Sequence, residues 1–259
     1  MPAFGPDFRA ALRQPLYDGA NRQPLWVALA AFGGCLAVQL FLPTLPYFLL
    51  LASSAEGSAS SALSLDMLLM SLAALIPTSL LVVWLVFRLA GRGGEAIRAT
   101  ALRQVSLGWA GWPVTVLGFA VVAMLAILVL RLVSGNWSTG GVEKGVSALA
   151  SRTWAPLIVV LATGVFGPIA EEFLFRGPLF AKLRGTRLGV AGTVVATSLL
   201  WALLHITEPW IGMSAIFVMG LLLGTLLLRF GSLVVPIACH CVCNLLGTLA
   251  LFGSGGTPT

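Results

Sequence analysis

Residues 154–180 read WAPLIVVLATGVFGPIAEEFLFRGPLF, an apolar run that contains two adjacent glutamates and one arginine. A helix that crosses a bilayer needs about 20 predominantly apolar residues, because each residue adds roughly 1.5 Å across a hydrocarbon core about 30 Å thick. The run has this length and therefore predicts a membrane span. A charged side chain inside such a span costs on the order of 2.5–3.5 kcal/mol on insertion scales, which makes Glu171, Glu172 and Arg176 candidates for function.

The composition of the whole chain indicates the same setting. Of its 259 residues, 58% are hydrophobic and only 9% are charged, and the mean hydropathy is +0.99. A soluble domain carries about 25% charged residues, so this chain could not cover a water-exposed surface. The composition predicts an all-α, polytopic transmembrane helical bundle. It excludes disordered, collagen-like and nucleic-acid-binding proteins.

Several apolar runs have the length of a membrane span or approach it. The run that begins at Leu25 contains Pro43 and Pro46, and proline interrupts helical hydrogen bonding, so we expect this span to kink or end early. Residues 91–112 carry three arginines among apolar residues, which is typical of an amphipathic connector on the membrane surface. We expect about seven spans (six to eight), near residues 25–50, 67–90, 113–133, 154–175, 189–207, 211–228 and 233–252.

The distribution of Lys and Arg predicts the orientation. The loops 53–66 and 208–210 contain neither residue. Positive charge is enriched in cytoplasmic loops, so we expect the N-terminus inside, the C-terminus outside and a site that opens toward the cytoplasmic half. Residues 1–24 are polar, unlike a signal peptide, and the expected location is a bacterial cytoplasmic (inner) membrane. If the spans alternate, four basic segments share one side: the N-terminal tail, 91–112, 182–187 and the turn at Arg229.

Both histidines of the chain lie in predicted spans. His205 ends the run TSLLWALLH. Residues four apart lie on the same face of a helix, so Trp201 and His205 share one face. His240 shares a face with Asn244 for the same reason. Counted from a turn at Gly185, His205 would lie roughly 30 Å into the bundle. Helix tilt would have to bring it to the same depth as Glu171, His240 and Asn244.

The two glutamates predict different roles. Glu172 and Arg176 are four residues apart and can form an ion pair. Glu171 is turned about 100° from Glu172 and is free to face the histidines. Each residue also has a purely structural interpretation: the pair can fix helix packing, the histidines and Asn244 can form interhelical hydrogen bonds, and Trp201 can simply pack.

Three motifs, in order along the chain, resemble those of the CPBP intramembrane proteases. This family includes CAAX proteases (type II CAAX prenyl endopeptidases) and bacteriocin-processing enzymes, and is also called the Abi family. EEFLFRG at 171–177 resembles a Glu-Glu pair followed by Arg and commonly Gly, and WALLH at 201–205 resembles Phe-x-x-x-His with Trp201 in place of Phe. His240 and Asn244 resemble the third motif. The resemblance covers a protease core at 153–252, whereas 1–152 (N-terminal helices and the connector) adds no motif and 253–259 is a short polar tail.

The resemblance implies an intramembrane endopeptidase in which Glu171 and His205 activate a water molecule. His240 and Asn244 would stabilise the oxyanion, because donors fixed on one helix face can meet developing negative charge where water is scarce. Glu172, Arg176 and Trp201 would have supporting roles. The family is viewed as metal-independent, so no cofactor is expected. The alternative is a zinc site formed by Glu171, His205 and His240.

Two other functions stay open at this point. One is a catalytically silent membrane protein that acts as a binding or immunity partner. The other is a small transporter, since carboxylates and histidines also form proton relays, although the expected number of spans and the lack of an internal repeat disfavour it. The expected partners are a peptide or membrane-protein substrate, with or without a lipid anchor, and the lipid bilayer, but no nucleic acid.

Overall fold

The computed structural model describes residues 24–45, 61–90, 105, 107–135 and 141–254, and every regular element in these residues is helical. The expected all-α bundle is therefore confirmed. In chain order the elements are α2 (Leu25–Phe41), α4 (Ser61–Ala90), α6 (Gly108–Ser134), α7 (Gly141–Leu149), α8 (Ala155–Leu161), the π-helical turn η2 (Ala162–Phe166), α9 (Gly167–Arg176), α10 (Pro178–Leu183), α11 (Gly189–Leu203), α12 (Trp210–Phe230) and α13 (Val234–Ser254).

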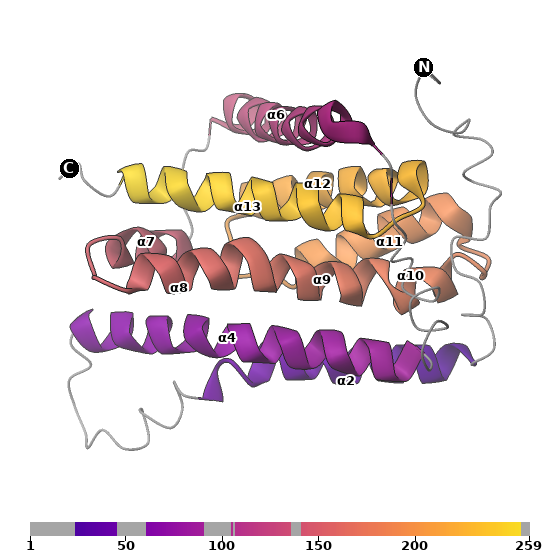
Figure 1. Ribbon diagram of the computed structural model, residues 1–259, viewed down its shortest axis with the longest axis horizontal. Helices are drawn as coiled ribbons and strands as arrows, with labels where there is room; N and C mark the ends of the chain where they lie inside the picture. The colour runs from indigo at the N-terminus through magenta and orange to yellow at the C-terminus, as the bar shows by residue number, and fades with distance from the viewer. Residues whose placement is uncertain (1–23, 46–60, 91–104, 106, 136–140, 255–259) are drawn as a thin grey trace.

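The long helices lie side by side with roughly parallel axes (Figure 1). α4 and α2 pack against each other on one side of the bundle, and α8, η2, α9 and α10 follow one another along its middle. α13 packs on η2 and α9, while α6 lies far from α4, in contact with α12 and α13. Residues from both halves of the sequence therefore surround the middle helices.

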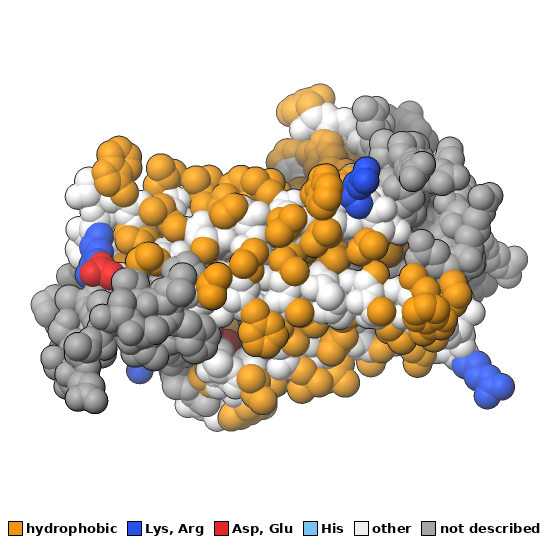
Figure 2. Space-filling model, turned by 90° about the horizontal axis from the view of Figure 1, so that it is seen from below, with side chains coloured by type: hydrophobic (Ala, Val, Ile, Leu, Met, Phe, Trp, Pro, Cys, Tyr) orange, Lys and Arg blue, Asp and Glu red, His pale blue; other side chains and the backbone are white. Residues whose placement is uncertain are grey.

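Large apolar side chains cover the outside of the bundle. Hydrophobic side chains predominate on the face in Figure 2, and α6 exposes Val114, Leu125 and Val129 among others. Water does not tolerate an apolar surface of this extent, whereas a bilayer does, so the chain is an integral membrane protein. Five helices in the described part of the chain are long and apolar enough to cross a membrane: Leu65–Leu89, Gly108–Ser134, Ala155–Leu183, Trp210–Phe230 and Val234–Gly253.

Several predicted boundaries differ from the structure. In the expected first span, α2 ends at Phe41, just before Pro43, as the prolines predicted, and residues 46–50 of that span lie outside the described ones. α11 ends at Leu203 and is likewise too short to cross a membrane by itself. The last part of the expected surface connector, from Gly108, belongs to α6, and its residues 91–104 lie outside the described ones. α7 lies in the stretch between the expected spans 113–133 and 154–175, where no helix was expected.

The span that carries the glutamates is not one straight α-helix. In η2 the helix is wound more widely, as a π-helix, over the five residues Ala162–Phe166. α9 then ends at Arg176, where Gly177 (φ −83°, ψ −129°) redirects the chain into α10. A Cβ atom on Gly177 would lie 2.3 Å from the carbonyl oxygen of Phe173. The backbone therefore requires glycine at the end of the Glu-Glu motif.

Small residues bring α11 close to α12. A Cβ atom on Gly220 would lie 2.8 Å from Cβ of Ser198, and one on Gly224 would lie 3.0 Å from Cγ1 of Val194. Such close approach is the usual role of small residues between membrane helices, where packing replaces the hydrophobic effect as the driving force. The contact holds the end of α11, which carries Trp201, against the Arg176 side of the bundle.

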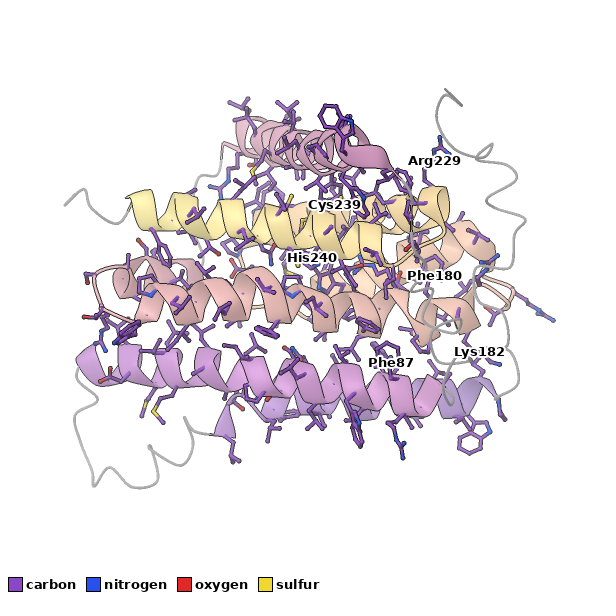
Figure 3. All side chains as sticks on the ribbon, viewed as in Figure 1. Phe87, Phe180, Lys182, Arg229, Cys239 and His240 are labelled. Carbon is purple, nitrogen blue, oxygen red and sulfur yellow. The ribbon has the colours of Figure 1, made fainter. Side chains whose placement is uncertain are left out.

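The basic turns that are described lie as expected. Lys182 in α10 and Arg229 in the last turn of α12 lie at the same end of the bundle (Figure 3). The membrane side that this end faces, and with it the inside location of the N-terminus, stays a prediction. The N-terminal tail and the loop residues 53–60 lie outside the described residues.

Candidate active site

The predicted ion pair between Glu172 and Arg176 is present and fully buried. Nη1 of Arg176 lies 3.1 Å from Oε1 of Glu172, and neither side chain is exposed at all. Nη2 of Arg176 also donates a hydrogen bond to the carbonyl oxygen of Gly220 at 3.2 Å. The guanidinium therefore ties α9 to α12 at Gly220, a glycine against which Ser198 of α11 packs closely.

Glu171 has a different environment from its neighbour. Its side chain is 27% exposed, and its Oε2 accepts a hydrogen bond of 2.9 Å from the indole nitrogen of Trp201. We interpreted Trp201 as a packing residue, and this interpretation is incomplete, because the side chain is also a donor to the candidate base. A buried tryptophan needs an acceptor for its N–H, and this requirement was the signal in the sequence that pointed to a polar partner.

His240 belongs to α13 and lies on the side of this helix that faces α9 (Figure 3). Its ring contacts both glutamates. Its Nδ1 lies 3.1 Å from Oε1 of Glu172, within hydrogen-bonding distance, and its Nε2 lies 3.8 Å from Oε2 of Glu171. The ring is 1% exposed. The contact with Glu172 was not expected from the sequence: this carboxylate joins Arg176 to His240 and so orients the imidazole.

His205 lies just beyond its helix rather than within it. α11 ends at Leu203, and the following residues form turns, so the expected span at 189–207 is shorter at this end. Nδ1 of His205 lies 2.9 Å from the carbonyl oxygen of Trp201. A carbonyl only accepts, so Nδ1 carries the proton, and in the neutral ring Nε2 is left as an acceptor.

Asn244 is held by the π-helical turn. Its Nδ2 donates a hydrogen bond of 3.0 Å to the carbonyl oxygen of Thr163 in η2. The hydroxyl of Thr163 lies 3.3 Å from that of Thr248, one turn further along α13. A π-turn displaces backbone carbonyls from the regular helical pattern and is frequent at functional sites. Here it supplies the acceptor that orients Asn244.

A cavity of about 340 Å³ connects these groups. One of its walls was missed by sequence reasoning: α6 contributes Met124, Ile127 and Arg131, from a region that carries no motif. Arg131 is a charged residue inside the expected span 113–133, and this was the signal that could have pointed to α6. No signal distinguishes Met124 and Ile127 from other residues of an apolar span. The predicted residues that line the cavity are Glu171, Trp201, His205, His240 and Asn244.

The cavity extends away from the basic end of the bundle. Glu208, which lines it, precedes α12, whereas Arg229 lies in the last turn of the same helix. If the basic end faces the cytoplasm, as its charge predicts, the cavity lies toward the opposite half of the membrane. Because the orientation of the bundle is itself a prediction, our expectation of a site that opens toward the cytoplasmic half also stays a prediction.

The structure and the comparisons leave the zinc alternative a prediction, like the metal-free mechanism. In the described part of the chain, no three His, Cys, Asp or Glu side chains gather into a group that could hold a metal ion. A His₂Glu site would need Glu171, His205 and His240 each about 2.0–2.2 Å from one ion. Oε2 of Glu171 accepts a hydrogen bond from Trp201, which leaves Oε1 as its other oxygen. Metal independence itself stays a prediction.

Comparison with protein families agrees with this site. Residues 153–246 match the family model described as type II CAAX prenyl endopeptidase Rce1-like. The match supports the class of intramembrane proteases, and it confirms the resemblance to the CAAX proteases that the three motifs predicted. The matched segment contains Glu171, His205, His240 and Asn244. The chain has no detectable match to a curated protein or to a solved structure.

Proposed function

We propose that the protein is an intramembrane endopeptidase that hydrolyses a peptide bond with a water molecule activated by Glu171 and His205. One observation carries this proposal: two adjacent glutamates have opposite environments. Glu172 is fully buried and bound to Arg176 and His240, whereas Glu171 reaches a cavity with 27% of its side chain exposed. A structural pair explains Glu172, but it does not explain a carboxylate held open toward a cavity inside a membrane bundle.

The free acceptors define the attacking step. Oε2 of Glu171 is occupied by Trp201, so Oε1 is the oxygen that accepts a proton from water, and Nε2 of His205 accepts a hydrogen bond from the same water. The water oxygen bonds to the carbonyl carbon, and the electrons of the C=O π bond move to the oxygen. Glu171 then returns its proton to the leaving nitrogen as the C–N bond breaks. Atoms and charge balance with no other reactant.

His240 and Asn244 are the proposed oxyanion donors. A carboxylate only accepts, so Nδ1 of His240 carries a proton toward Glu172, and the imidazole presents Nε2 on the Glu171 side. The proposed step uses the imidazolium form, in which Nε2 also carries an N–H that donates to the oxyanion. The amide of Asn244 has two N–H groups, and the bond to Thr163 uses one of them. Donors that are oriented before the reaction stabilise developing charge without further reorganisation.

The lining of the cavity indicates the substrate class. Met124, Ile127, Ile211 and Met219 surround the polar groups with apolar side chains. This lining suits a peptide or a segment of a membrane protein, with or without a lipid anchor, that reaches the site from the bilayer. We propose that the reaction uses no metal or other cofactor and takes place in a bacterial cytoplasmic membrane.

Comparison of protein N-termini tests the proposal. Membranes from cells that make the wild-type protein, Glu171→Gln or Asp66→Asn would be analysed by mass spectrometry of new N-termini. Asp66 is an exposed carboxylate paired with Arg152, so Asp66→Asn is a matched control for the same chemical change outside the cavity. We expect termini that are present in the wild type and Asp66→Asn and absent in Glu171→Gln. Identical termini in all three, with the proteins folded and inserted, would favour the binding-partner function.

A further inference from the structure

Trp201 contacts more of the site than any role in packing requires. Its indole N–H donates to Glu171, and its backbone carbonyl oxygen accepts from Nδ1 of His205. The guanidinium carbon of Arg176 lies 4.9 Å from the centre of the indole ring, and the ring of His240 meets it edge-on at 5.1 Å between centroids. One residue thus touches both members of the proposed water-activating pair and two of the groups behind them.

The indole has little freedom to move. The residue is 2% exposed, and Arg176, His205 and His240 contact its ring from α9, from the turn after α11 and from α13. A ring held on several sides fixes the direction of its N–H. The hydrogen bond to Glu171 therefore constrains the carboxylate and not the tryptophan.

We propose that Trp201 is a positioning residue that fixes the general base and its imidazole partner together. The indole N–H holds Oε2 of Glu171, which leaves Oε1 for the water. The backbone carbonyl holds Nδ1–H of His205, which leaves Nε2 for the same water. This inference rests on the proposed function, and it gives the tryptophan that replaces phenylalanine in the Phe-x-x-x-His motif a specific task.

Trp201→Phe separates the two contacts. Phenylalanine keeps an aromatic ring near Arg176 and the histidines and keeps the carbonyl that binds His205, but it has no N–H for Glu171. Without this charge-assisted hydrogen bond, the carboxylate can rotate, and the reaction loses the advantage of a base held in the attack geometry. The substitution therefore removes the hydrogen bond to Glu171 and keeps the hydrogen bond to His205.

Indole NMR tests the contact without any substrate. The full-length protein, labelled with ¹⁵N-tryptophan in lipid nanodiscs, has eight tryptophans and hence one indole N–H signal from each. Trp201→Phe identifies the signal of interest by its loss. We expect Glu171→Gln to shift this signal upfield, because an amide oxygen is a weaker acceptor than a carboxylate, and Asp66→Asn to leave it in place. An unchanged Trp201 signal in Glu171→Gln would overturn the contact.

Kinetics test the consequence, with the peptide that the wild type cleaves in a Glu171-dependent manner. We expect Trp201→Phe to lower kcat by about ten- to a hundredfold, the range for one hydrogen bond to a charged group, with KM unchanged. Trp210, 61% exposed, gives the control Trp210→Phe, which should keep full kcat. A Trp201→Phe protein as fast as the wild type would refute the positioning role. If the proposed function itself is wrong, the result is different: no cleavage depends on Glu171. In that case the NMR experiment still decides whether Trp201 donates its hydrogen bond to Glu171.

Discussion

Replacing Arg176 by methionine tests whether the buried ion pair organises the site. The substitution keeps an unbranched side chain that replaces the aliphatic part of arginine, but it removes the guanidinium that faces Glu172 at 3.1 Å and its hydrogen bond to the carbonyl oxygen of Gly220. Both side chains of the pair are fully buried, so the remaining carboxylate has no water to replace its partner. Loss of one partner of a buried pair costs about 3–5 kcal/mol. We expect Arg176→Met to destabilise the folded protein by this amount.

The chain offers a matched control for this change. Arg152 pairs with Asp66, but these side chains are 33% and 53% exposed. An exposed pair contributes only about 0.2–1 kcal/mol, so Arg152→Met should have a small effect. Equilibrium unfolding of the purified proteins in mixed micelles, followed by circular dichroism as the fraction of denaturing detergent rises, measures both free energies. Equal losses in the two variants would refute the reasoning, because burial would then have no influence on the cost.

A second substitution separates loss of charge balance from loss of shape. Glu172→Gln combined with Arg176→Met removes both charges, so the buried carboxylate is no longer uncompensated. We expect the double variant to be more stable than Arg176→Met alone, since residues in contact show non-additive effects. It should still lack activity, because Nδ1 of His240 loses the carboxylate that orients it. A double variant that is less stable than the single one would contradict the assignment of the cost to the unpaired charge.

Three further predictions concern the backbone, the oxyanion donors and the metal. Gly177→Ala should destabilise the protein by about 2 kcal/mol or more in the same unfolding assay, because the new Cβ atom meets the carbonyl oxygen of Phe173 at 2.3 Å. In the control Gly118→Ala, the new Cβ atom meets nothing within 4 Å, so this variant should keep its stability. Asn244→Ala should lower kcat on the identified peptide by about 10²–10³-fold, as loss of one oxyanion donor does, and an unchanged kcat would remove Asn244 from the mechanism. Prolonged dialysis against EDTA should leave the cleavage rate unchanged, whereas loss that is restored by Zn²⁺ would establish a metal site.

The membrane bundle and most of the candidate site followed from the sequence for simple physical reasons. Apolar runs of sufficient length predict helices, because a helix satisfies its own backbone hydrogen bonds inside a bilayer. The spacing of four between Glu172 and Arg176 predicted their pair, and the one-residue offset of Glu171 predicted its different direction. These are local properties of a helix, and a single sequence contains them.

Relations between distant segments were not predictable in the same way. The depth estimate put His205 roughly 30 Å from a turn at Gly185, but the chain between α10 and α11 turns over several residues, and α11 starts only at Gly189. The helix that leads to His205 has only 15 residues and ends at Leu203, so its rise is shorter, at roughly 22 Å. The contact of Glu172 with His240 joins residues 68 positions apart, and its register depends on η2, a π-turn that no pattern of apolar residues indicates.

The contrast between the two glutamates shows how one helix can supply both a support and a reactive group. Glu172 faces the bundle interior, where Arg176 compensates its charge and its oxygen orients His240. Glu171, one residue earlier on the same helix, points into the cavity. There Trp201 donates a hydrogen bond to its Oε2, which leaves Oε1 for the proposed water. The cost of placing the first carboxylate in the membrane is thus offset by an ion pair, whereas the second depends on a polar cavity. Since α6 forms part of that cavity's wall, the environment of Glu171 depends on a helix outside the matched segment, and the segment 153–246 alone would leave the proposed base facing lipid on that side.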